Sequence, residues 1–206
     1  MSAEHRNPSE QQRAEARREQ ILCAAATCFR DRGFHGASIA QISKAAGMSA
    51  GHIYHYFDNK ESIIAAIVER DLEYLLTLGA ELRAAEDTRE ALIEHVIEAV
   101  QKNLAPEEAG LKLEVMAEAA RNPHVADIVR RADVVCRDSF AATLRGIRRA
   151  NGLGDGGDAE IDSMIELIAA MFEGLMIRGI RNPGMDHAAV TRRFQAILRV
   201  VLSQPD

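Results

Sequence analysis

Residues 38–57 read SIAQISKAAGMSAGHIYHYF, and this stretch decides how the rest of the chain is interpreted. Ser38 is followed three residues later by Gln41, the spacing of a capping box that begins a helix. Gly47 supplies the left-handed conformation that ends this helix, and Ser49 can cap the next one. The stretch therefore predicts two short helices joined by a tight turn, which is the arrangement of a helix-turn-helix.

The second of these helices has side chains suited to the DNA major groove, which is wide enough to admit one helix. Ala50 and Gly51 are small, so the backbone can come close to bases. Ile53 and Phe57 lie four residues apart and would fix the helix to its support. Lys60 would add its charge to a helix N-terminus that faces phosphates. Residues offering hydrogen bonds and flat surfaces are His52, Tyr54, His55 and Tyr56. The alternative is an ordinary helical hairpin with exposed aromatic side chains.

The charge distribution favours a nucleic-acid partner for the first part of the chain. The 206 residues have a net charge of −6, which by itself argues against such a partner. Residues 1–60, however, hold 8 Lys and Arg against 6 Asp and Glu, whereas residues 61–206 hold 17 against 25. This asymmetry indicates two regions with different partners.

The remaining sequence predicts helices separated by short polar joints. With 47% hydrophobic and 27% charged residues, 5 Pro and 14 Gly, the composition is that of a helical globular protein. We expect an all-α fold of about nine helices, with a three-helix helix-turn-helix domain followed by a helical bundle. The expected division is a loose arm over 1–12, a helix-turn-helix DNA-binding domain over 13–60, and a helical bundle over 61–206.

Several classes of protein and site are not expected. The sequence has no apolar run long enough for a membrane span and no signal-peptide pattern, so we expect a cytoplasmic protein with no membrane partner. Cys23, Cys28 and Cys136 are scattered, which fits neither a disulfide framework nor a metal site. No metal, cofactor or catalytic motif is expected. Two other functions stay open: a helical ligand-binding or adaptor dimer that does not bind an operator, and an all-α enzyme.

Residues 33–69, GFHGASIAQISKAAGMSAGHIYHYFDNKESIIAAIVE, resemble the DNA-binding region of the TetR/AcrR family of transcriptional regulators. The shared features are the aromatic-Gly pair before the capping Ser, the I-A-x-x-A-G-x-S turn, the Y-x-Y-F run and the N-K-E helix start. The resemblance covers about residues 15–75. It implies a homodimer that binds a palindromic DNA operator, most often as a repressor, and is released by a small-molecule effector. It also implies that residues 61–206 form the ligand-binding and dimerisation domain.

The resemblance also implies roles for single residues. Ser38 and Lys60 correspond to phosphate-binding positions, and Tyr54 and His55 do as well. Ala50, Gly51 and His52 stand where members approach bases, and Tyr56 stands where a contact with a base or a phosphate is common. Ser49, the cap of the second short helix, is also expected to bind DNA. Ala40 stands where some members carry an arginine that reads bases, so the operator sequence does not transfer.

The last two helices have broad apolar faces, and the resemblance implies that these faces form an isologous four-helix dimer interface. The residues expected there are Ile161, Ile165, Ile168, Phe172, Leu175, Val190, Phe194, Ile197 and Val201. Burial of part of this face in the core of one chain is the alternative.

An effector pocket is expected between helices of the bundle. Its candidate residues are His95, Met116, Phe140, Met164, Met171, Phe172 and Met176, although core packing explains each of them equally well. Glu114 and Glu118 share one helix face. If that face points inward, the two carboxylates would favour a cationic ligand, and if it points outward they are solvated. The helix that starts at Lys60 is expected to couple the two domains.

Overall fold

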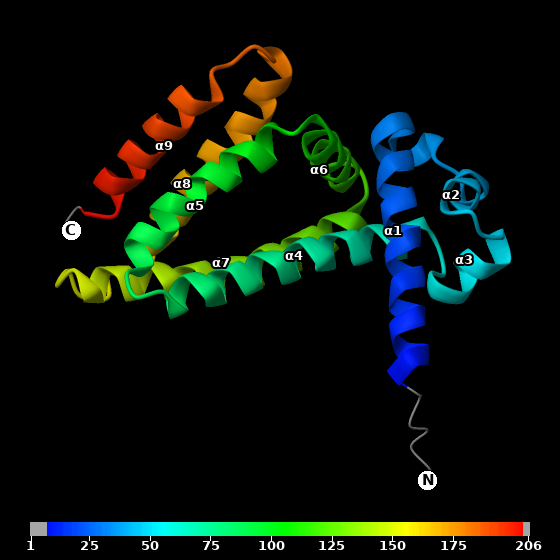
Figure 1. The fold of residues 1–206 in the computed structure, drawn as a ribbon, viewed down its shortest axis with the longest axis horizontal. Helices are drawn as coiled ribbons and strands as arrows, with labels where there is room; N and C mark the ends of the chain where they lie inside the picture. The colour runs from blue at the N-terminus through cyan, green and yellow to red at the C-terminus, as the bar shows by residue number, and fades with distance from the viewer. Residues whose placement is uncertain (1–7, 204–206) are drawn as a thin grey trace, which may run out of the picture. The chain divides into compact units, whose positions relative to one another are not determined.

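The computed structural model describes residues 8–203, and this part of the chain is built from nine helices without a strand (Figure 1). The all-α prediction and the predicted number of helices are therefore confirmed. The helices are α1 (Pro8–Gly36), α2 (Ile39–Ala46), α3 (Ala50–Tyr56), α4 (Lys60–Ala84), α5 (Thr88–Leu104), α6 (Pro106–Ala119), α7 (Pro123–Ala150), α8 (Asp158–Arg181) and α9 (His187–Val201).

The first helix begins earlier than the sequence pattern indicated. Helix α1 starts at Pro8, where proline is tolerated because the first helical N–H groups have no partner within the helix. The predicted arm is therefore wrong for residues 8–12, and residues 1–7 lie outside the described part. Gly33 has φ 72° and ψ 162°, so it interrupts α1 three residues before the end of the helix.

The described chain divides into two compact units. Unit 1 comprises the described part of residues 1–69 together with 111–129, and unit 2 comprises 70–110 together with the described part of 130–206. The unit boundaries fall inside α4, α6 and α7. This division differs from the predicted boundary after residue 60, because apolar side chains of 111–129 complete the core of unit 1. They are Leu111, Val115 and Val125.

The core of unit 1 joins the helix-turn-helix to its supporting helices. Ile42 of α2 and Ile53 of α3 have no exposed surface, and both belong to one apolar cluster with Phe29 of α1. Ile63 and Ile67 of α4 close the same cluster. Since full burial of one such side chain contributes roughly 1.5–3 kcal/mol, this cluster supplies most of what holds the short helices in place.

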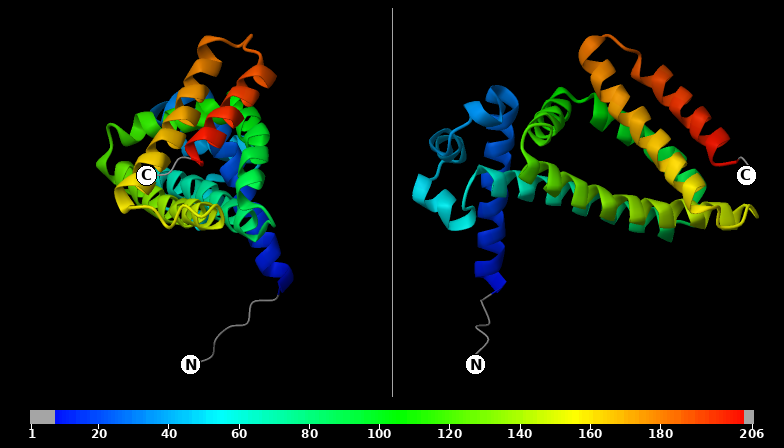
Figure 2. Two further views of the ribbon diagram at one scale, coloured as in Figure 1. Left: turned by 90° about the vertical axis from the view of Figure 1, so that its left-hand side faces the viewer. Right: turned by 180° about the vertical axis from the view of Figure 1, so that it is seen from behind.

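Unit 2 is a helical bundle with its own core. Helix α5 packs against both α8 and α9, and α8 and α9 lie side by side in opposite directions in both views of Figure 2. Arg83 of α4 donates to the Ser139 carbonyl and to Thr143 Oγ1 of α7, at 3.1 and 2.9 Å. The buried side chains at the centre include Ile93, Val96, Leu144, Ile147, Ile161, Ile165 and Leu198. Among residues 8–203, no helix is both long and apolar enough to cross a membrane.

Candidate nucleic-acid interface

The capping predicted for α2 is present in full. Ser38 Oγ accepts a hydrogen bond from the N–H of Gln41 at 3.2 Å, and Gln41 Oε1 accepts one from the N–H of Ser38 at 2.8 Å. Gly47 has φ 64° and ψ 32°, so it ends α2 in the left-handed conformation. A side chain there would be strained, and glycine makes the turn into α3 possible.

Helix α3 presents its polar residues outward. Ser49 Oγ caps it by accepting from the N–H of His52 at 3.2 Å. Ile53 of α3 and Phe57 just after it are buried, as expected of residues that fix the helix to its support. The exposed residues on and before the helix are Ser38, Ser49, Ala50, Gly51, His52, Tyr54 and His55. Tyr54 keeps 54% of its surface exposed, so a large aromatic side chain is available on this face.

Three aromatic rings cluster along α3. The ring centroids of His52 and Tyr56 lie 5.4 Å apart, and those of His55 and Tyr56 lie 5.2 Å apart at 87°. Tyr56 is half-buried and packs against the core of unit 1. The Tyr56 ring therefore lies between the core and the two exposed histidine rings. The outer surface of α3 is formed by His52, Tyr54 and His55.

Lys60 occupies a different position from the one its phosphate-binding role implied. Its ammonium group donates to the carbonyls of Phe34 and Ala37, at 2.6 and 3.0 Å, and lies 4.4 Å from the centroid of the Phe34 ring. A lysine ammonium has three N–H groups, so one remains for another acceptor. Lys60 thus holds the segment before α2.

Two contacts that support α2 and α3 were missed by sequence reasoning. Gln20 Nε2 of α1 donates to the carbonyl of Ala46 at the end of α2, at 2.8 Å. The Arg18 guanidinium lies 5.8 Å from the Phe57 ring centroid. Both join residues more than 20 positions apart, and no local spacing pattern signals such contacts.

The predicted effector residues do not gather at one place in the structure. Met116 is 49% exposed and belongs to unit 1, so the prediction of a bundle pocket is wrong for it. Met164 is part of the core of unit 2, with Phe140 and Phe172 packed against that core, and Met176 is also buried. His95 is half-buried, with Nδ1 3.6 Å from Glu98 Oε2. Met171 lines a groove between α8 and α9.

The predicted dimer residues are also only partly exposed. Ile161, Ile165 and Ile168 lie in the core of unit 2, so their assignment to the dimer interface is wrong, and the alternative of burial within one chain holds for them. Leu175 is buried but borders the groove between α8 and α9, together with Val190, Phe194 and Ile197. Phe172 packs its ring against Phe194, with centroids 5.3 Å apart, and Val201 packs against the core. The side of α8 that lines this groove is formed by Leu167 and Ala170, which are exposed, and by Met171 and Gly174, which are half-buried.

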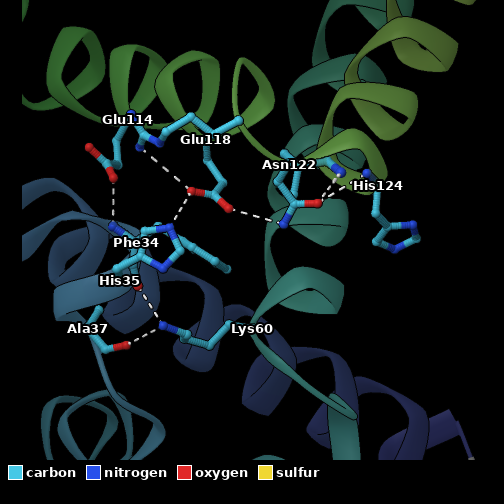
Figure 3. A network of polar contacts seen from close by, with 10 residues as sticks. Phe34, His35, Ala37, Lys60, Glu114, Glu118, Asn122 and His124 are labelled. Atoms are coloured by element: carbon cyan, nitrogen blue, oxygen red, sulfur yellow. Dashed lines mark hydrogen bonds and ion pairs between the residues drawn. The ribbon is translucent and has the colours of Figure 1, made fainter.

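Glu114 is half-buried and Glu118 is buried, and neither lines the groove between α8 and α9. Both point toward the end of α1 within unit 1 (Figure 3). Glu118 is only 1% exposed. In the part of the chain that the structure describes, no group of three or more His, Cys, Asp or Glu side chains could hold a metal ion.

Comparisons with known proteins agree with this geometry. Residues 21–67 match the family described as bacterial regulatory proteins, tetR family, and residues 85–203 match the BetI-type transcriptional repressor, C-terminal family. The HTH-type transcriptional regulator UidR of Escherichia coli K12 is 31% identical over 135 residues, which cover 66% of this chain and 68% of UidR.

Solved structures show the same fold. Salmonella enterica GusR superposes with a TM-score of 0.77 at 28% identity, covering 92% of this chain and 96% of GusR. The transcriptional regulator FadR from Bacillus subtilis, solved in complex with stearoyl-CoA, superposes with a TM-score of 0.73 at 17% identity, covering 87% and 96%. The chain belongs to the TetR family of bacterial regulatory proteins. It is a DNA-binding transcriptional regulator with a helix-turn-helix.

Proposed function

We propose that this chain is a homodimeric repressor that binds a palindromic operator through α3 and is released when a small molecule binds the C-terminal bundle. The observation that carries the proposal is the outer face of α3, where His52, Tyr54 and His55 are exposed above the buried Ile53. A short helix with this polarity can enter the major groove while its apolar side stays on the core.

Roles for the individual residues follow from their exposure. Ala50, Gly51 and His52 begin α3 and would approach base edges, since the first residues of a recognition helix do so. Ser38, Ser49, Tyr54 and His55 would contact phosphates or bases through their hydroxyl and imidazole groups. Tyr56 would act mainly by supporting the two histidine rings, and Lys60 by holding the segment before α2.

Dimerisation is supported by the groove between α8 and α9. The groove has a volume of about 740 Å³ and a mostly apolar lining that includes Leu167, Met171 and Ile197. Leu167 and Ile197 are 47% and 44% exposed, and exposed apolar patches of this kind mark interaction sites. Such a dimer is expected to present its two copies of α3 about one turn of DNA apart, roughly 34–36 Å, because the half-sites of a palindromic operator have that spacing.

Repression is supported by the family matched by residues 85–203, which is described as a transcriptional repressor. Release by a small molecule is supported by B. subtilis FadR, which was solved in complex with stearoyl-CoA. The unit boundary inside α4 supports coupling along that helix, because its first residue, Lys60, holds the segment before α2.

The test is binding of the purified full chain to the DNA upstream of its own gene, at several salt concentrations, with the mass in solution measured in parallel. A repressor is expected to bind as a dimer with an affinity that falls steeply with salt, because each phosphate contact releases counterions. A dimer without DNA binding would support the adaptor alternative. A monomer at micromolar concentration would contradict the proposed interface.

A further inference from the structure

The segment between α1 and α2 is held from two sides by charged groups. We call residues 34–37, which follow the interruption at Gly33 and lead into Ser38, the α1 hook. The Phe34 N–H donates to Glu114 Oε1 of α6 at 2.6 Å, and Lys60 of α4 donates to the Phe34 and Ala37 carbonyls (Figure 3). The hook is thus bound through its N–H by a carboxylate and through its carbonyls by an ammonium group.

Gly33 makes the contact with Glu114 possible. Its extended backbone at positive φ turns the Phe34 N–H away from the helix axis, so this N–H is directed at α6. A Cβ atom at Gly33 would lie 3.2 Å from Glu114 Oε1, tighter than ordinary contacts between such atoms. The close approach of the carboxylate therefore depends on a glycine at this position.

Glu118, one turn further along α6, makes a second contact with the hook. Its Oε2 lies 3.0 Å from Nε2 of His35 and 3.7 Å from the Arg121 guanidinium. Its Oε1 accepts from Asn122 Nδ2 at 3.1 Å. A buried carboxylate is strongly unfavourable without partners. Of the groups around Glu118, His35 is the one that belongs to the hook, so this contact joins α6 to the hook.

We propose that Glu114 and Glu118 are positioning residues for operator binding, which they serve by fixing the α1 hook and, through it, the capping Ser38 and α2. The inference rests on the proposed operator binding. Neither carboxylate would touch DNA. Their role is geometric: α2 and α3 are too short to hold their own orientation, so a displaced hook would tilt both relative to the DNA groove. Charge-assisted hydrogen bonds are about twice as strong as neutral ones, which suits the bond from the Phe34 N–H to Glu114 to this task.

The experiment compares Glu114→Ala, Glu114→Gln, Glu118→Gln and the control Glu107→Ala, which removes an exposed carboxylate from the first turn of the same helix. The DNA is a fragment that the wild-type chain binds. Glu114→Ala is expected to weaken binding about tenfold, or ~1.4 kcal/mol. Glu114→Gln keeps an oxygen for the Phe34 N–H and is expected to restore most of the affinity. Glu118→Gln is expected to weaken binding in the same direction as Glu114→Ala, and Glu107→Ala to bind like wild type.

A local measurement separates positioning from general loss of stability. Amide hydrogen exchange at Phe34 is expected to accelerate in Glu114→Ala while exchange at the buried Ile53 stays as in wild type. Equal DNA affinity of Glu114→Ala and Glu107→Ala would overturn the inference, as would a Glu114→Gln variant as weak as Glu114→Ala. Absence of DNA binding by the wild-type chain would instead overturn the proposed function together with this inference.

Discussion

Replacing Lys60 by alanine tests the unexpected inward position of its ammonium group. The change removes two hydrogen bonds, to the Phe34 and Ala37 carbonyls, and the contact with the Phe34 ring. Hydrogen bonds to charged groups contribute about 1.5–3 kcal/mol each, and a cation–π contact adds roughly 0.5–1 kcal/mol. Together these contributions come to about 3.5–7 kcal/mol. Because Lys60 is only half-buried, solvent screening reduces this, and we expect a total of about 2–4 kcal/mol.

The assay is thermal unfolding followed by circular dichroism, with Lys44→Ala as the matched control. Lys44 is an exposed lysine in the last turn of α2. For a chain of this length, 2–4 kcal/mol lowers the melting temperature by about 4–16 °C. Lys44→Ala is expected to change stability by less than about 0.5 kcal/mol, as exposed substitutions do. If Lys60→Ala melts like wild type and only the salt dependence of DNA binding changes, then Lys60 points to DNA and the reasoning is refuted.

Two further substitutions test other parts of the structure. Gly33→Ala is expected to lower the free energy of unfolding by about 1–3 kcal/mol in a urea titration, because φ 72° with ψ 162° is a conformation that essentially only glycine adopts. The control Gly36→Ala changes a glycine without positive φ and should leave the free energy of unfolding unchanged. Ala170→Glu places a carboxylate in the groove between α8 and α9 and is expected to give a folded monomer by light scattering. Ala142→Glu on the exposed side of α7 should leave the dimer intact.

The sequence predicted those features that depend on neighbouring residues. The capping box of Ser38 and Gln41, the left-handed Gly47 and the burial of Ile53 all follow from spacings of three to six positions, and the structure has each of them. Local rules of this kind fix helix ends and the apolar side of a helix. They also sufficed to predict the outward face of α3.

Features that depend on long-range packing could not be predicted in this way. The apolar periodicity of α8 is the same whether Ile161 and Ile165 face their own core or a partner, and the structure places them in the core. Similarly, the residues next to Glu118 in the sequence do not show that its side chain is only 1% exposed. One of the groups packed against this carboxylate is His35 of the α1 hook, more than 80 positions earlier. The direction of Lys60 depends on the same hook.

These long-range contacts change where the determinants of DNA affinity should be sought. Helix α3 has seven residues, too few to be stable alone, so its orientation is set by what it packs on. Part of that support is apolar, through Ile53, and tolerates small shifts. The polar part is directional: Gln20 fixes the end of α2, while Lys60 and Glu114 fix the hook before it. Substitutions at these three residues should therefore weaken binding to every operator sequence alike, whereas substitutions on the outer face of α3 should alter the preference among sequences.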